Sequence, residues 1–280
     1  MADESWRIPM LVQELAAKVQ QPPSRYMQPE QYHPVSLDVG AETLEPIPVI
    51  DLSRLSTAGG ADDDESGKLR LALQTWGALP VRVEPEDERN LVHWPQHPKT
   101  FRGLLHEYTL NCKRIKDCIL GTTAKTLGLG EDCFARFNYY PPCPRPDLVF
   151  GVKPHSDSSG VLTILLIDKD VSGLQVLRDG VWHNNVPASP FMLLINVGDF
   201  MEIISNGVLR SPVHRAVSNA EKERISLAMF HGLDPDEEIE PAPAALLSEN
   251  QPARYRTLKA KEYLLAGRII KLISQPKIKK

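Results

Sequence analysis

The pattern of apolar and polar residues changes character near residue 135. Before that point, apolar residues recur at helical spacing in three stretches, and one shorter run is β-branched and led by proline. Spacings of three and four residues predict helices, whereas a β-branched run predicts a strand. We therefore expect helices over Ile8–Val19, Lys68–Trp76 and Lys99–Leu127, a strand over Ile47–Leu52, and a solvated loop over Ala58–Glu65.

From Ala135 onward, short apolar runs alternate with glycine, proline, asparagine and aspartate. Short strands separated by such turn residues at regular spacing are typical of a sandwich, a barrel or a jelly roll. The expected strands are Ala135–Tyr140, Val161–Ile167, Leu174–Leu177, Phe191–Val197, Val213–Val217 and Ile225–Phe230. A final helix is expected over Leu258–Ile273, packed against the outside of this β region.

Composition narrows the class of protein. A length of 280 residues fits one large domain, and a net charge of −4 is too mild to predict a nucleic-acid partner or a membrane partner. The four cysteines form no Cys-x-x-Cys motif, and the chain opens without a signal-peptide pattern. No apolar run reaches the length of a membrane span. We expect a cytoplasmic protein with free thiols that acts on a small molecule.

The strongest chemical signal is a set of possible metal ligands. His155 and Asp157 stand two residues apart, and His214 follows in Ser211–Arg215. Residues at i and i+2 of a strand point to the same face, so one strand could present both side chains. Two histidines and one carboxylate leave three open positions on an octahedral metal, as in non-haem Fe(II) oxygenases. Zn²⁺ is the rival ion, because the same ligand types also build hydrolytic zinc sites.

A second pair of residues favours oxidation over hydrolysis. Arg224 follows His214 by ten residues, and Ser226 should share its strand face. A guanidinium group binds a carboxylate with two parallel hydrogen bonds, so the pair predicts a clamp for an acidic co-substrate. Hydrolysis needs no such clamp. The alternative for Arg224 is an ordinary surface ion pair, which would contribute little.

Seven sequence blocks together resemble the plant 2-oxoglutarate/Fe(II)-dependent dioxygenases. The resemblance is closest to the specialised-metabolism branch, which contains anthocyanidin synthase, flavonol synthase and the senescence-related and norcoclaurine-synthase-like proteins. It covers roughly residues 135–255. The blocks are Ala135–Asp147, Lys153–Asp157, Leu174–Val176, Asn196–Asp199, Ser205–Gly207, Ser211–Arg215 and Arg224–Ser226.

The resemblance implies a mainly β fold with flanking helices, whose core is a double-stranded β-helix, or jelly roll. It implies an N-terminal helical region over residues 1–130, a dioxygenase core over 131–235 and a C-terminal loop and helix over 236–280. The implied cofactors are Fe(II), 2-oxoglutarate and O₂, with ascorbate as reductant. The implied reaction is hydroxylation, desaturation or demethylation of a small plant metabolite, with release of succinate and CO₂.

The resemblance also assigns roles around the metal ligands His155, Asp157 and His214. Arg224, Ser226 and Tyr140 correspond to residues that hold the distal carboxylate of 2-oxoglutarate, and Asn138 corresponds to a residue lining that pocket. Phe230 corresponds to an aromatic side chain that packs on ring substrates, although core packing would explain it equally well. Arg136 falls at a polar position on the substrate side, and a solvated strand residue is the alternative.

The N-terminal half departs from the family pattern. After Trp76 and Gly77 the family continues into further helices, whereas this chain passes through Ala78–Pro85 almost directly to a later part of the pattern. Loss of those helices should expose apolar surface and permit self-association. The alternative function is therefore a shortened relative that binds metal and 2-oxoglutarate but is catalytically impaired, and acts as a binding or regulatory protein.

Overall fold

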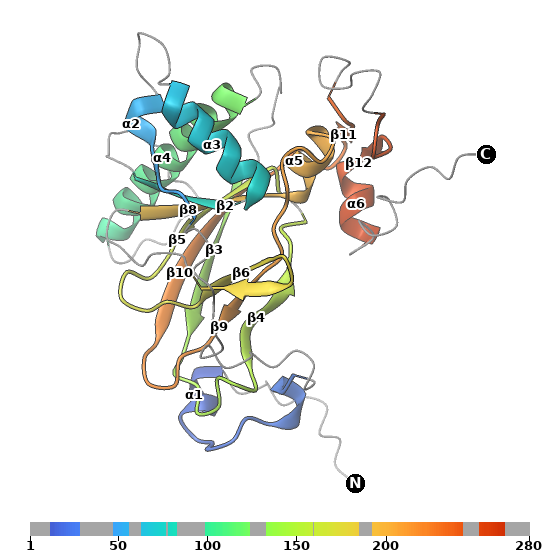
Figure 1. Cartoon of the computed structure of the whole chain (residues 1–280). Coiled ribbons are helices and arrows are strands. Elements are labelled where there is room, and N and C mark those ends of the chain that lie inside the picture. Colours follow the sequence, from blue (N-terminus) through green and yellow to red (C-terminus); the bar gives the residue numbers. More distant parts are fainter. Residues whose placement is uncertain are drawn as a thin grey trace, which may run out of the picture.

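The computed structural model describes residues 12–28, 47–55, 63–76, 78–82, 99–123, 133–158, 160–184, 192–242 and 252–266 (Figure 1). Two β-sheets face each other, because inward side chains from both sheets line one cavity. From β3 to β10 the chain passes repeatedly from one sheet to the other. The expected jelly-roll core is confirmed.

The larger sheet has six strands in the order β1-β2-β8-β5-β10-β3. The antiparallel part of this sheet, from β2 through β8, β5 and β10 to β3, carries continuous pairing without a shift of register. The strands are β1 Ile50–Asp51, β2 Ala78–Arg82, β8 Met192–Val197, β5 Leu162–Leu166, β10 Arg224–His231 and β3 Cys133–Tyr140.

The smaller sheet has four strands in the order β4-β9-β6-β7. They are β4 Phe150–His155, β9 His214–Val217, β6 Leu174–Arg178 and β7 Val181–His183. The register between β4 and β9 shifts twice before His155 and His214 come to lie opposite each other. This irregular pairing brings two strands that are distant in sequence together at the candidate metal site.

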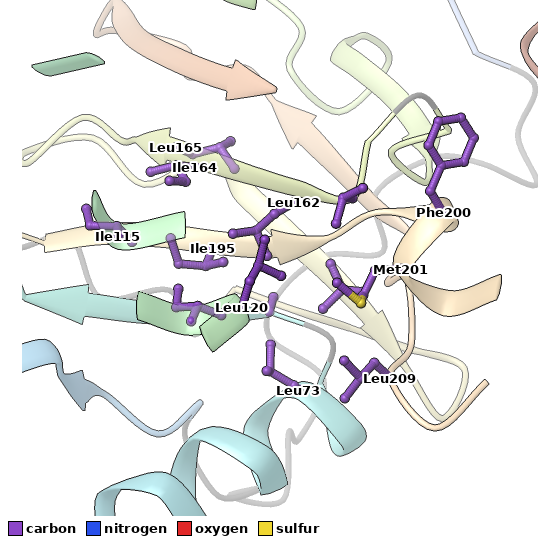
Figure 2. Packing of buried hydrophobic residues seen from close by; sticks show 14 of the residues in the cluster. Leu73, Ile115, Leu120, Leu162, Ile164, Leu165, Ile195, Phe200, Met201 and Leu209 are labelled. Atoms are coloured by element: carbon purple, nitrogen blue, oxygen red, sulfur yellow. The ribbon is translucent and has the colours of Figure 1, made fainter. Parts of the chain in front are cut away.

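Helices pack against part of the outer face of the larger sheet (Figure 1). Helix α4, Lys99–Thr123, buries Leu105, Cys112, Ile115 and Ile119 in the main core cluster. These positions recur at helical spacing, which explains why the pattern predicted this helix. Figure 2 shows α4 side chains beside those of α3 (Asp63–Thr75), β5 and β8.

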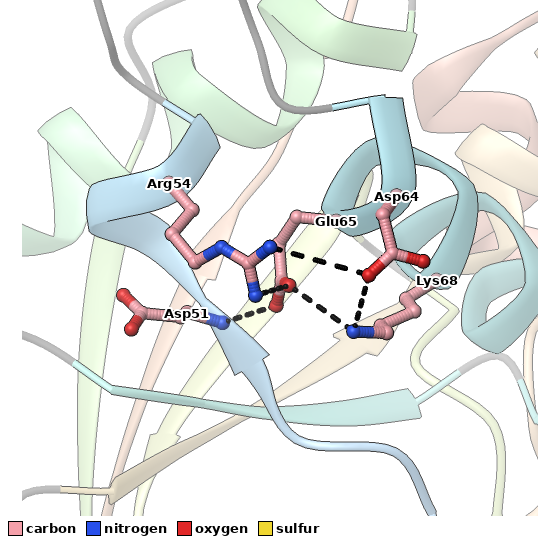
Figure 3. Close-up of polar contacts among 5 residues, drawn as sticks. All are labelled: Asp51, Arg54, Asp64, Glu65 and Lys68. Atoms are coloured by element: carbon pink, nitrogen blue, oxygen red, sulfur yellow. Dashed lines mark hydrogen bonds and ion pairs between the residues drawn. The ribbon is translucent and has the colours of Figure 1, made fainter.

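Helix α3 starts earlier than expected, so residues 63–65 belong to a helix and not to a solvated loop. The reason is the buried carboxylate of Glu65, which accepts the backbone N–H of Asp51 at 2.7 Å and lies 3.0 Å from Arg54. Lys68 lies 3.5 Å from the same carboxylate (Figure 3). Acidic residues are also favoured in the first turn of a helix. The cluster joins β1, α2 (Leu52–Leu55) and α3.

Several other boundaries differ from the sequence-based expectation. The run Ile47–Leu52 forms only the short β1, because the chain turns into α2 at Leu52. Strands β2 and β7 and helix α5, Asp199–Ile204, were not predicted, and the strand expected to carry His155 and Asp157 is β4, which ends at His155. The last expected helix begins two residues late, because Leu258 and Lys259 form β12 and pair with β11, Glu238–Ile239.

Helix α6, Ala260–Ala266, follows β12, and the expected continuation to Ile273 lies outside the described residues. At the other end, α1, Val12–Ala16, and a 3-10 turn, Ser24–Tyr26, flank β3 and β4. No helix in the described part of the chain has both the length and the hydrophobicity needed to span a membrane.

The end of the larger sheet formed by β3 carries exposed apolar side chains. Strand β3 pairs with β10 on one side only in the described part of the chain. On the outer face, Phe137 and Tyr139 of β3, Ile225 of β10 and Leu166 of β5 are all exposed. Cross-strand pairing places these four side chains on one surface. We call it the outer β3 patch.

Candidate functional site

Three residues with metal-ligand side chains meet between the two sheets. His155 is the last residue of β4 and His214 is the first residue of β9. Asp157 Oδ1 lies 3.9 Å from His155 Nε2 and 3.6 Å from His214 Nε2. One ligand atom from each residue lies within 4.8 Å of the others, a grouping that one ion could bridge.

Asp157 reaches the site by a different route from the expected one. Strand β4 ends at His155, so Asp157 does not share a strand face with it. Instead, the chain turns out of the strand, and the carbonyl oxygen of Asp157 accepts the backbone N–H of Asp199 at 3.0 Å. The expectation of one strand presenting both ligands was wrong, because a contact with α5 fixes the loop.

Hydrogen bonds orient both imidazole rings. His155 Nδ1 lies 2.7 Å from the carbonyl oxygen of Lys153, and His214 Nδ1 lies 3.0 Å from that of Pro212. A carbonyl oxygen can only accept, so each Nδ1 carries the proton and each Nε2 keeps a lone pair on the Asp157 side. Burial and the nearby His214 lower the pKa of His155, which favours the neutral form that binds metals.

The carboxylate of Asp157 supports the same interpretation. This side chain is buried, and its Oδ2 atom has no hydrogen-bond partner among the described residues. A buried carboxylate oxygen without a partner is costly. A divalent cation between Asp157 and the two imidazoles would remove that cost, so the donor set fits a metal of the Fe(II) or Zn²⁺ type.

The predicted carboxylate clamp lies across the same cavity. Arg224 and Ser226 alternate with outward residues along β10, and the register pairs them with Tyr140 and Asn138 of β3. Asn138 Nδ2 donates a hydrogen bond to Ser226 Oγ at 3.3 Å. The guanidinium group of Arg224 lies 5.1 Å from the centre of the Tyr140 ring. All four predicted co-substrate residues therefore lie together.

The guanidinium group of Arg224 is buried with part of its hydrogen-bonding capacity unused among the described residues. Its side chain is 4% exposed, and its Nε and Nη1 atoms have no hydrogen-bond partner among the described residues. Burial lowers the pKa of this guanidinium group, and Tyr140 and the carboxylate of Asp168 act in the opposite direction. A carboxylate that accepted both N–H groups would satisfy it.

Sequence reasoning missed the glycine that makes room for this side chain. A Cβ atom on Gly173 would lie 2.9 Å from Arg224 Cδ and 3.0 Å from the carbonyl oxygen of Val217. Gly173 therefore lets the Arg224 side chain pass close to the backbone before β6. A glycine directly before the block Leu174–Val176 was the available signal.

The metal ligands and the clamp line a small cavity of about 50 Å³. Arg136 and Phe230, the predicted substrate residues, also line it. Phe230 stacks on Phe134 with a distance of 4.6 Å between the ring centres. A larger cavity of about 430 Å³ adjoins it, because both are lined by Arg136, Asn138, Tyr140 and Val152. Leu15, Val19 and Tyr26 from the N-terminal segment also line the larger cavity.

Two other histidines, His183 and His231, are buried outside this group of ligands. The ring of His183 meets that of Trp76 edge-on at 5.3 Å. His231 is buried, and its pKa of about 4 reflects burial and the nearby charge of Lys116. Within the described residues, neither belongs to a group of ligand atoms like that of His155, Asp157 and His214.

Comparison with known proteins gives one consistent result. Residues 131–233 match the 2OG-Fe(II) oxygenase superfamily. Protein SRG1 of Arabidopsis thaliana is 40% identical over 195 residues, which cover 65% of this chain and 53% of that protein. Jasmonate-induced oxygenase 2 of Arabidopsis thaliana is 30% identical over 338 residues, which cover 94% of this chain and 90% of that protein. The match to SRG1 thus spans about half of its length.

The same comparisons also concern the fold and the length of the chain. The crystal structure of JOX2 in complex with 2OG, Fe and JA has a TM-score of 0.75 and 27% identity, covering 96% of this chain and 99% of that one. The alignment with jasmonate-induced oxygenase 2 runs over 338 positions, more than the 280 residues of this chain, so the relative has residues inside the aligned stretch that this chain lacks. The chain belongs to the 2OG-Fe(II) oxygenase superfamily.

Proposed function

We propose that this protein oxidises a small metabolite in a reaction that depends on Fe(II), 2-oxoglutarate and O₂ and releases succinate and CO₂. The observation that carries the proposal is one cavity with two complementary halves. On one side are His155, Asp157 and His214, and on the other is the buried Arg224, two of whose nitrogen atoms have no hydrogen-bond partner in the described part of the chain. A metal that chelates one end of a dicarboxylate and a cation that binds the other would satisfy both halves.

The bound iron would supply O₂ activation through its open positions. The protein contributes position and charge. The Nδ1–H bonds of His155 and His214 keep both rings turned toward Asp157. Arg224 and Ser226 lie on the inner face of β10 and bind the distal carboxylate of 2-oxoglutarate, with Tyr140 and Asn138 beside them. The two sheets shield this contact from water, which strengthens it.

For the substrate we propose a small, largely apolar plant metabolite with a polar or acidic group. Arg136 is exposed, has no hydrogen-bond or ion-pair partner among the described residues, and adds to the lowering of the His155 pKa, so its charge acts at the metal site. The aromatic side chain of Phe230 lines the same cavity. The similar structures include JOX2 with bound JA and a rice dioxygenase for auxin oxidation, and the relatives include a codeine O-demethylase.

The test does not require the substrate. Anaerobic addition of Fe(II) and then 2-oxoglutarate to the metal-free protein should produce the charge-transfer absorption of the chelate, and air should then release succinate. His214→Ala should abolish both signals while its circular dichroism stays native. His183→Ala, a buried histidine outside the site, is the matched control and should keep both. Succinate release that is unchanged in His214→Ala would refute the assignment.

A binding or regulatory function is the alternative, because this chain lacks residues that jasmonate-induced oxygenase 2 has. A protein with an incomplete substrate pocket would bind iron and 2-oxoglutarate without coupled oxidation, and would act as a binding or regulatory protein. The two functions differ in one measurement. A stable charge-transfer absorption in air, with no succinate over many hours, would favour the binding protein.

We also propose that the protein resides in the cytoplasm and self-associates through the outer β3 patch. The four cysteines are free thiols, as expected in a reducing compartment. The exposed apolar side chains of Phe137, Ile225 and Leu166 support association. Fractionation of the tissue or cells that express the protein tests the first proposal, and sedimentation of the purified chain tests the second.

A further inference from the structure

The short helix α5 touches both segments that bring metal ligands to the site. At its first residue, the backbone N–H of Asp199 donates to the carbonyl oxygen of Asp157 at 3.0 Å. The side chain of Asp199 accepts the hydroxyl of Ser156 at 3.2 Å. Both contacts are with the loop that follows His155. Asp199 is 1% exposed, so water does not compete for these bonds.

One turn further along α5, Glu202 makes the equivalent contact with the other segment. Its Oε2 atom accepts the backbone N–H of Ser211 at 2.6 Å. Ser211 stands three residues before His214, and the intervening Pro212 provides the carbonyl that orients the His214 ring. Residues three apart on a helix share a face, so both acids can act from one side of α5.

Two tyrosines of the C-terminal region hold the same two acids. Tyr263 of α6 donates its hydroxyl to Asp199 Oδ2 at 2.9 Å. Tyr255 donates its hydroxyl to Glu202 Oε1 at 2.9 Å. Both tyrosines are buried, and the Tyr263 ring meets Phe200 of α5 edge-on at 5.6 Å. A carboxylate has several acceptor positions, so each acid can join a ligand segment to a tyrosine.

We infer that α5 fixes the distance between the loop after His155 and the segment before His214, and we call this helix the α5 bracket. Tyr255 and Tyr263 hold the helix in position through their hydrogen bonds to Glu202 and Asp199. Asp199 and Glu202 are positioning residues, because they touch the chain beside the ligands and not the ligand side chains. The C-terminal region thereby tunes the affinity of the site for its metal. This inference rests on the proposed function, since it takes His155, Asp157 and His214 as the metal ligands.

The experiment uses Mn(II) as a redox-stable probe of the metal-free, full-length protein. Its affinity is followed by electron paramagnetic resonance, which separates free from bound ion. Tyr263→Phe and Tyr255→Phe each remove one hydroxyl and keep the ring. Loss of outer contacts costs metal sites roughly 10- to 100-fold in affinity, and for these more remote hydroxyls we expect about 3- to 10-fold. Tyr139→Phe is the matched control, because its hydroxyl donates to exposed Glu223 at 2.7 Å.

The outcomes separate this inference from the function on which it rests. No Mn(II) binding by the wild type would overturn both. Binding by the wild type with equal affinity in both tyrosine variants would overturn the bracket alone. A purely structural role would lower the melting temperature of the metal-free variants and leave the Mn(II) affinity unchanged. If either tyrosine variant does not fold, Ser156→Ala decides, because it removes only the hydroxyl donated to Asp199.

Discussion

At the scale of single residues, Arg224 carries the sharpest prediction. Arg224→Lys replaces a planar group with a point charge that cannot form two parallel hydrogen bonds. The loss should be about 1.5–3 kcal/mol, which raises the 2-oxoglutarate dissociation constant roughly 10- to 150-fold. Calorimetric titration of the Fe(II)- or Mn(II)-loaded protein measures it. Arg145→Lys, at an exposed ion pair with Asp147, should change nothing. Equal affinity in Arg224→Lys would show that Arg224 is not the clamp.

His231 predicts a pH dependence of stability. Its pKa is about 4 in the folded protein, against about 6.5 for an ordinary histidine, because the ring is buried and lies near the charge of Lys116. Between these values the unfolded chain binds a proton that the folded chain does not. The stabilising contribution is therefore complete above pH 6.5 and is lost as the pH falls toward 4.

The size of this effect is about 3 kcal/mol in the free energy of unfolding. Urea unfolding of the metal-free protein at a series of pH values should show a steeper loss in the wild type than in His231→Leu. The other titrating groups are the same in both proteins, so the difference isolates His231. Parallel pH profiles would mean that the folded protein protonates His231 normally.

At the scale of elements, the entry into α5 depends on a glycine. A Cβ atom on Gly198 would lie 1.9 Å from the carbonyl oxygen of Gly160, which no side-chain movement can relieve. Gly198→Ala should therefore destabilise the fold by about 1–3 kcal/mol. It should also weaken metal binding, because the shift separates Asp199 from Asp157.

The matched control is Gly67→Ala in α3, where an added Cβ meets nothing within 4 Å. Helix propensity predicts that this change stabilises the protein by roughly 0.5–1 kcal/mol. Denaturant melts of the two variants should move in opposite directions. A stability for Gly198→Ala that equals that of the wild type would contradict the close approach of the two backbones.

At the scale of the whole molecule, we expect the exposed outer β3 patch to lower the free energy of unfolding. Leaving about 200 Å² of apolar surface uncovered forfeits roughly 5 kcal/mol, whereas domains are stable by only about 5–15 kcal/mol. We expect a low melting temperature, binding of a hydrophobic dye, concentration-dependent association, and oxidation of 2-oxoglutarate that is poorly coupled to substrate. Leu166→Lys should reduce both the dye binding and the association, because it charges the patch.

The control is a lysine at exposed Val181 of β7, which belongs to the smaller sheet and not to the patch. Sedimentation velocity over a concentration series measures the association. A monomeric wild type with a high, cooperative melting transition and coupled turnover would show that the patch is covered by other parts of the chain.

The sequence by itself predicted the β core and the residues that lie together in the candidate site. Alternation along β10 placed Arg224 and Ser226 on one face, and a period of two needs no tertiary information. The apolar residues of α4 recur at helical spacing, and this pattern can also be read from the sequence of that segment alone. The order of the seven sequence blocks identified the family, because so many matches in order are specific even where each alone is weak.

Only the tertiary structure decided what depends on contacts between distant segments. Asp157 leaves the strand because Asp199, forty-two residues later, holds its carbonyl oxygen. Helix α5 is too short to show a helical period, and α3 starts early because Glu65 is buried against Asp51. Gly173 and Gly198 are required by neighbours that come close only in the folded chain. Such closeness has no local signal in sequence, because it is set by packing and not by periodicity.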